Sequence, residues 1–86
     1  FFHTDIDGFR GKMRYDVVVA NLLTEVLQRT MGVLANLVSE RGVLIASGIG
    51  ARWEREMRRC FRDHNLAVDA IEKMDGWCAF MVSVVR

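Results

Sequence analysis

The chain has 86 residues, of which 51% are apolar and 27% charged, enough for one small domain and too apolar for a disordered segment. Its net charge of +1, from 12 basic and 11 acidic residues, argues against a dedicated nucleic-acid binder. No window contains the ~18 consecutive apolar residues of a membrane span, and the two cysteines, Cys60 and Cys78, are too few for a disulfide scaffold. We expect a cytoplasmic chain with free thiols and no membrane partner.

The first half of the chain predicts a strand, a helix and a second strand. Residues 15–21 form an uninterrupted β-branched run, typical of a strand buried on both faces. Residues 24–41 have helical periodicity, with Thr24 as the expected N-cap and Gly42 as the expected left-handed residue after the helix. Residues 42–47 are a second apolar run and predict a second buried strand.

A loop and a second helix are expected next. Residues 48–50, G-I-G, predict a loop that can bring the backbone close to a ligand. Residues 51–64 predict an amphipathic helix that carries a Glu54–Arg58 pair on its outside and ends at a left-handed Asn65. Its apolar stripe consists of Trp53, Met57, Cys60, Phe61 and His64.

The tail predicts a β-hairpin. Residues 67–74 and 77–85 have strand patterns, and the Asp75-Gly76 dipeptide between them is a strong signal for a two-residue turn. Trp77 begins the returning strand, and we expect both tryptophans of the chain to pack in the core.

These elements assemble into an α/β sheet. Helical crossovers make the first three strands parallel, and right-handed crossovers place both helices on one face. The last strand runs antiparallel to its hairpin partner and can insert beside the second strand. Because it is apolar on both sides, the other face needs a cover, either the missing N-terminal half of a larger domain or a second copy of the chain. Since the chain begins with Phe1 instead of methionine, we expect a sequence that starts mid-protein.

Two groups of side chains have the chemistry of metal ligands. His3, Asp5 and Asp7 alternate, but the later ligands of a calcium loop are missing. Cys60 and His64 lie one helical turn apart, a spacing that zinc can use, but zinc needs two further ligands. We expect a polar turn for the first group, core packing for the second, and no metal site.

A basic stripe follows the expected helix 51–64. It consists of Arg52, Arg55, Arg59 and Arg62. Acidic residues are interleaved with it, which favours a solvated outer face, and contact with ribosomal RNA or an acidic partner is the alternative.

Three motifs, in order, carry a resemblance to a known family. Residues 16–23, D-V-V-V-A-N-L-L, resemble the D-x-V-x-A-N-[IL]-L signature of the bacterial ribosomal protein L-eleven methyltransferase (PrmA-type) family, which belongs to the class I S-adenosylmethionine-dependent methyltransferases. Residues 44–49, L-I-A-S-G-I, resemble its L-I-L-S-G-I, and residues 76–77 its closing E-W. The resemblance covers residues 16–86. It implies the C-terminal half of a Rossmann-like methyltransferase sheet, with three parallel strands, two crossover helices and an antiparallel hairpin strand.

The sequence departs from this family at several positions. Gly76 replaces the acidic residue before the tryptophan, and residues 39–42 read S-E-R-G where K-P-G-G is usual. The donor-binding G-x-G-x-G turn and the acidic residue after the second family strand are absent from the chain. Residues 1–86 are therefore expected to be a partial methyltransferase domain without its glycine-rich N-terminal half, and to be inactive alone.

The resemblance also assigns site residues. Asn21 matches the asparagine at the methyl-transfer site, where its amide would be catalytic, would contact the donor and would hold the substrate amine in line. Leu22 and Leu23 would line the substrate pocket, and Asp5 would bind near the adenine of S-adenosylmethionine. From the residues alone, Asn21 has a second interpretation, as a cap on the helix that follows.

The function implied by this resemblance is methyl transfer from S-adenosylmethionine to a protein amine. In this family the acceptor is a ribosomal protein. The alternative is a non-catalytic module that dimerises or binds a partner through its open sheet face or its edge strand at residues 16–21. A different nucleotide-binding α/β protein is the weakest hypothesis, because the phosphate-binding glycine turn is missing.

Overall fold

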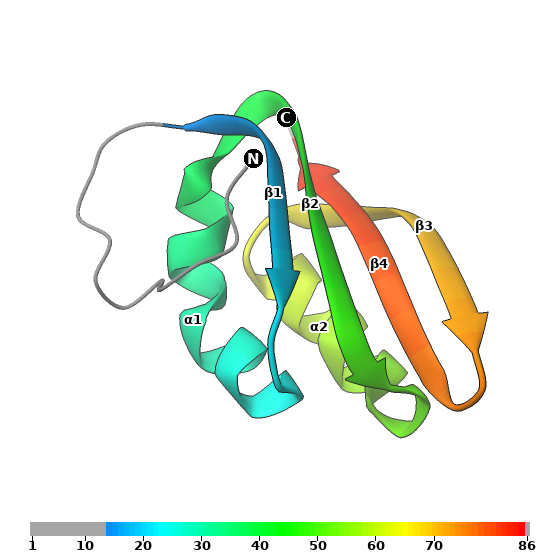
Figure 1. Cartoon of the computed structure of the whole chain (residues 1–86). Coiled ribbons are helices and arrows are strands. Elements are labelled where there is room, and N and C mark those ends of the chain that lie inside the picture. Colours follow the sequence, from blue (N-terminus) through cyan, green and yellow to red (C-terminus); the bar gives the residue numbers. More distant parts are fainter. Residues whose placement is uncertain (1–13, 86) are drawn as a thin grey trace.

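A computed structural model describes residues 14–85 and shows two helices packed on one side of a four-stranded sheet (Figure 1). The elements in chain order are β1 (Tyr15–Asn21), α1 (Thr24–Leu37), β2 (Val38–Gly50), the 3-10 turn η1 (Ala51–Trp53), α2 (Glu54–Asp63), β3 (Leu66–Met74) and β4 (Trp77–Val84). This order and the element types agree with the sequence prediction.

The strands are arranged in the order β1-β2-β4-β3. β1 pairs in parallel with β2, whereas β4 is antiparallel to both of its neighbours, β2 and β3. The strands β1, β2 and β3 therefore run in one direction. The predicted insertion of the last strand beside the second is confirmed, and so is the parallel direction of the first three.

One face of the sheet and the inner sides of both helices form the core. Alternate residues of β1, β2 and β4 point into it, and Val18, Leu44 and Phe80 are fully buried examples. The α2 side chain Phe61 meets Phe80 edge-on, with ring centroids 5.1 Å apart, so the second helix is anchored on β4. The inward-facing residues of the strands and the apolar sides of the helices therefore pack together on one side of the sheet.

The opposite face of the sheet is open within residues 14–85, because both helices lie on the same side (Figure 1). The register places Val19 beside Ile45 and Ile45 beside Met81, which makes an apolar row across three strands. Val17 and Met81 are 36% and 40% exposed. We call Val17, Val19, Val43, Ile45 and Met81 the open face. The prediction that the two helices cover a single face is confirmed.

The first helix ends earlier than predicted. α1 stops at Leu37, and the chain passes directly into β2 at Val38, which is buried and pairs with Tyr15. Gly42 is therefore a strand residue, and the expectation of a left-handed residue after a helix ending at residue 41 is wrong. A Cβ at Gly42 would lie 2.7 Å from the carbonyl oxygen of Asp16. Close packing of β2 on β1 thus requires glycine here.

Two further local expectations are corrected. Thr24 is the first residue of α1 and not its cap, because Leu23 occupies the N-cap position and no side chain caps the helix. Residues 48–50 belong to β2 instead of a loop, and Ile49 is fully buried. Gly48 has a φ of 77° at a register shift between β2 and β4, so the glycine forms a β-bulge that keeps the strand paired.

The second helix and the hairpin follow the prediction with small changes. The helical segment begins with the 3-10 turn η1, and Asn65 ends it with a φ of 59°. Asp75 and Gly76 have φ values of 47° and 84°, as the tight turn between two antiparallel strands requires.

Candidate functional site

A hollow of about 630 Å³ lies where the parallel strands β1 and β2 end. Its walls come from the first turn of α1, the end of β2, η1 and the β3–β4 turn, which meet at the lower end of the sheet in Figure 1. Open α/β sheets place their ligands at this carboxyl edge of the strands. The hollow therefore lies near Asn21, the last residue of β1, where the sequence predicts the methyl-transfer site.

Backbone contacts connect the walls of the hollow. The Ala51 amide donates to the Gly76 carbonyl at 2.8 Å, which ties the β3–β4 turn to the end of β2. Asn21 pairs with Ser47 in the parallel register, and a Cβ at Gly48 would collide with the Asn21 Oδ1. The absence of a side chain at Gly48 thus leaves room for the Asn21 amide at the rim of the hollow.

Two tryptophans form aromatic walls. Trp77 is 58% exposed, because the inward positions of β4 start at Cys78, so the expectation that it packs in the core is wrong. Trp53 is half-buried against the core, and the Arg52 guanidinium lies 5.4 Å from its ring centroid. A Cβ at Gly50 would lie 3.3 Å from Trp53 Cδ1, so glycine allows the indole to approach β2.

The polar lining of the hollow comes from the first turns of α1 and from η1. Glu25 and Gln28 both line it and are exposed, and Thr24 and Arg52 line it as well. Leu23, which is 76% exposed, adds an apolar side chain at the N-cap position of α1. The lining therefore combines a carboxylate, an amide, a hydroxyl and a guanidinium with apolar surface, which suits a hydrogen-bonding group on an apolar stem.

The structure separates the predicted site residues. Asn21 is exposed at the end of β1 and does not cap α1. Leu23 lines the hollow, whereas Leu22 is half-buried and packs against the core. Asp5 lies outside the described residues. The roles assigned to these four residues stay predictions.

Sequence reasoning missed Glu25, Gln28 and Trp77 as lining residues. The alternation of β4 carries a signal for Trp77, since counting outward from the buried Phe80 puts position 77 on the open side. For the α1 residues no local signal exists, because their relevance depends on the turn that folds over them.

Neither cysteine lines this hollow. The Nδ1 atom of His64 lies 2.9 Å from the Cys60 carbonyl oxygen, so these two residues meet through the backbone. Among residues 14–85, no three His, Cys, Asp or Glu side chains are grouped to hold a metal ion. The predicted set that contains His3 lies outside the described residues. Burial raises the pKa of the Cys60 and Cys78 thiols, and the nearby charges of Asp63 and Glu54, respectively, raise it further.

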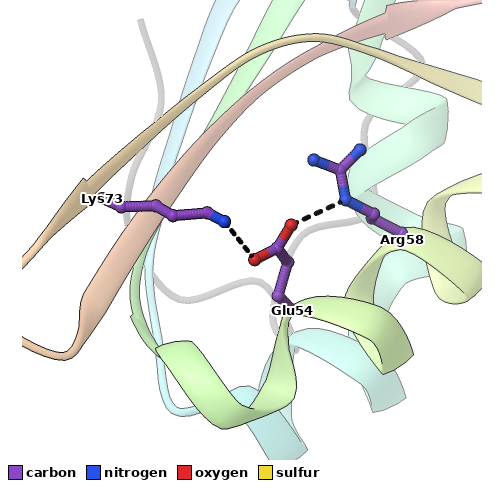
Figure 2. A network of polar contacts seen from close by, with 3 residues as sticks. All are labelled: Glu54, Arg58 and Lys73. Atoms are coloured by element: carbon purple, nitrogen blue, oxygen red, sulfur yellow. Dashed lines mark hydrogen bonds and ion pairs between the residues drawn. The ribbon is translucent and has the colours of Figure 1, made fainter.

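A polar network joins α2 to β3 on the surface, as Figure 2 shows. Arg58 Nε lies 3.0 Å from Glu54 Oε2, which confirms the predicted pair, and Lys73 Nζ lies 2.8 Å from Glu54 Oε1. Hydrogen bonds from Lys73 and then Arg58 hold the pKa of Glu54 below its ordinary value.

Comparison with known proteins gives consistent matches. The family model described as "Ribosomal protein L11 methyltransferase (PrmA)" matches residues 2–84. The ribosomal protein L11 methyltransferase of Bacillus subtilis is 30% identical over 76 residues, which are 88% of this chain and 24% of that protein. The protein of the same name from Thiobacillus denitrificans is 35% identical over 75 residues, 87% of this chain and 25% of that protein. The chain thus spans about a quarter of the length of these curated relatives.

Solved structures show the same fold. The ribosomal protein L11 methylase of Lactobacillus delbrueckii subsp. bulgaricus aligns with a TM-score of 0.80 at 23% identity, covering 86% of this chain and 38% of that chain. An S-adenosylmethionine-dependent methyltransferase of Clostridium acetobutylicum aligns with a TM-score of 0.75 at 10% identity, covering 96% of this chain and 63% of that chain. The sheet and its two helices therefore have the Rossmann-like arrangement of methyltransferase domains. Within residues 14–85, no helix combines the length and the apolar character needed to cross a membrane.

Proposed function

Because the chain belongs to the ribosomal protein L11 methyltransferase family, we propose that it is the acceptor-side part of an enzyme that methylates an amine of a ribosomal protein. The observation that carries this proposal is the arrangement at the end of β1, where the Asn21 amide lies against Gly48 beside a hollow with polar and aromatic walls. The free thiols Cys60 and Cys78 suit a reducing cytoplasm, where we place the enzyme.

We also propose that residues 1–86 are a partial domain. The open face and the edge of β1 that has no partner strand within residues 14–85 support this proposal, as does the quarter of each relative's length that the chain spans. In the complete domain, a preceding segment with the glycine-rich turn would pair with β1 and hold most of the methyl donor.

S-adenosylmethionine, when bound, supplies a methyl group on a positively charged sulfur that a nucleophile can attack. The residues present fit the methyl-bearing end of this donor. Gly48 lines the hollow, and its lack of a side chain leaves room for the Asn21 Oδ1, which offers a hydrogen-bond acceptor beside the hollow. Both lie at the strand ends, where the fold binds ligands.

The hollow can prepare an amine for attack. A lysine amine carries a proton at neutral pH, with an ordinary pKa of about 10.4, and must lose it before its lone pair can react. The Glu25 carboxylate accepts a hydrogen bond from the amine at the hollow, and the Arg52 charge together with the apolar wall at Trp77 then disfavours the charged form of the amine. The proton leaves to water, and the Asn21 carbonyl accepts an N–H from the neutral amine and so orients the lone pair.

A non-catalytic module is the second candidate. The apolar row Val19, Ile45 and Met81 on the open face is the observation that favours it. In this case the face or the β1 edge would be covered by a second copy of the chain.

Substitution of Asn21 tests the methyl-transfer proposal. In the polypeptide that carries residues 1–86 with the donor-binding half, we expect Asn21→Ala to lower kcat by about 100-fold or more, because positioning of the amine is lost. Radiolabelled methyl transfer to purified ribosomal proteins measures this, and Asn36→Ala, on the exposed side of α1, is the matched control. Unchanged kcat in Asn21→Ala would remove the proposed role. Titration of the 86-residue chain with millimolar donor should produce no heat, since the glycine-rich turn is absent from it.

A further inference from the structure

A second hollow, of about 640 Å³, lies between the outer side of α2 and the start of β3. Arginine side chains at positions 55, 58, 59 and 62 line it, and Leu66 and Val68 add apolar surface. We call it the arginine hollow. It shares no lining residue with the hollow at the strand ends, so it is a separate feature of the molecule.

Three of these arginines form no ion pair among the described residues, although Glu56 and Asp63 lie on the same helix. Within residues 14–85, Arg55, Arg59 and Arg62 form no ion pair, whereas Arg58 is held by Glu54 (Figure 2). Glu54, the acidic residue of the lining, is itself balanced by Lys73 at 2.8 Å. The net charge of +1 averages over the whole surface and conceals this local positive excess.

The spacing of the three arginines is regular. Positions 55, 59 and 62 lie at i, i+4 and i+7, on one side of α2. With a rise of 1.5 Å per residue, successive arginines are separated by about 6 Å and about 4.5 Å along the helix axis. Successive phosphates along a nucleic-acid strand are a similar distance apart. Each guanidinium also offers a planar fork that matches two phosphate oxygens.

We propose that the arginine hollow binds the phosphate backbone of a nucleic-acid strand. An acidic peptide is the other polyanion to weigh, but exposed arginine–carboxylate pairs each contribute little. When an arginine neutralises a phosphate of a nucleic-acid strand, the cation condensed on that phosphate is released into solution. This release makes the binding free energy more favourable for each contact. None of the described lining residues is aromatic, so bases have no stacking platform, and we infer binding without sequence preference. The inference goes beyond the proposed methyl transfer and does not depend on it.

Fluorescence anisotropy of a labelled 12-nucleotide uridine RNA, mixed with the 86-residue chain over a range of salt concentrations, tests this proposal. The variant Arg55→Gln/Arg59→Gln/Arg62→Gln should bind at least tenfold more weakly at low salt. The slope of log K against log salt should become shallower by about 2, since each single-strand phosphate contact contributes roughly 0.7. The matched control is Arg14→Gln/Arg29→Gln/Arg41→Gln, which removes the same charge from exposed positions outside the hollow and should bind nearly as well as the native chain.

Three results would overturn the proposal. An equal loss in the control would show a general charge effect, and polyglutamate that displaces the RNA at equal charge concentration would show an acidic-peptide site. A more than tenfold difference between uridine RNA and thymidine DNA of equal length would show recognition of bases or sugars. Circular dichroism verifies that each variant is folded, and no arm of the experiment measures methyl transfer, so its failure leaves the proposed function untouched.

Discussion

The two edge strands of the sheet, β1 and β3, are built differently. β1 carries Asp16 and a register shift near its start, but its centre, Val17, Val18 and Val19, is apolar, and one of its edges has no partner strand among the described residues. β3 has a register shift around Asp69, near its middle, and carries Glu72 and Lys73 near its end. Bulges and charges are the devices by which proteins prevent edge-to-edge pairing. β3 therefore has these protective features along most of its length, whereas the centre of β1 lacks them.

The same contrast holds between the two faces. The face under the helices is closed by fully buried residues such as Leu44, while its neighbour in the chain, Ile45, points to the open face and stays half-buried. The two contrasts place the unsatisfied surface of residues 14–85 at the edge of β1 and on the open face. This is the physical basis for proposing that a preceding segment completes the domain.

The largest effect is expected from the two neighbours on β2. Leu44→Ala should destabilise the chain by about 2–5 kcal/mol, because it opens a cavity in the core. Ile45→Ala removes a similar volume on the open face and should cost less than about 1.5 kcal/mol, since water already reaches this side chain. Urea unfolding measures both. Equal losses would show that the open face is covered in solution and would break the contrast between the faces.

Two glycine substitutions test how closely β1 and β2 pack. Gly42→Ala should cost about 3 kcal/mol, because the new Cβ would lie 2.7 Å and 2.8 Å from the carbonyl oxygens of Asp16 and Tyr15. Gly76→Ala should cost only about 1 kcal/mol, since its φ of 84° is strained for alanine but nothing lies within 4 Å. Thermal unfolding compares the two. A larger loss at Gly76 would mean that β1 moves away from β2 easily.

The β1 side can also be altered by charge. Val17→Lys/Val19→Lys places two ammonium groups on the open face of the edge strand and should weaken self-association of the chain by about tenfold, roughly 1.4 kcal/mol. Multi-angle light scattering across a concentration series measures this. Glu72→Lys on β3, which also makes the net charge more positive by two, is the control and should leave self-association unchanged, because β3 already carries charges. If the native chain is monomeric throughout, the dimerising-module alternative is lost.

The smallest effect concerns the network on α2. The folded pKa of Glu54 is lowered by Lys73 and Arg58, so its contribution to stability is present above the ordinary glutamate pKa and is lost as the pH falls through the lowered folded pKa. We expect the carboxyl resonance of Glu54 to titrate below the ordinary glutamate pKa, and this lowering of the pKa to shrink in high salt. Lys73→Met should raise the Glu54 pKa. An unchanged titration in this variant would show that the contact in Figure 2 is not formed in solution.

Local sequence patterns were sufficient for most elements. The β-branched run at residues 15–21 became β1 at the same bounds, and the Asp75-Gly76 dipeptide became the turn of the hairpin. Left-handed Asn65 was also predicted from its position after an amphipathic stripe. These features depend on neighbours in the chain, through periodicity, backbone conformation and turn chemistry, so they can be read without knowing the fold.

The site could be predicted only in part. The motif at residues 16–23 pointed to Asn21 and to the carboxyl edge of the sheet, where the structure shows a hollow. The separation of Leu22 from Leu23 and the exposure of Trp77 were not predicted, because they depend on which face each residue meets after the strands have paired.

The sequence by itself determined the kinds and order of the elements, the parallel direction of the first three strands and the single face that the helices cover. Tertiary structure decided where α1 stops, why Gly42 must lack a side chain, and which residues gather at the strand ends. The reason is that these features arise from contacts between segments far apart in the chain. A buried Val38 that pairs with Tyr15 outweighs the local preference for another helical turn.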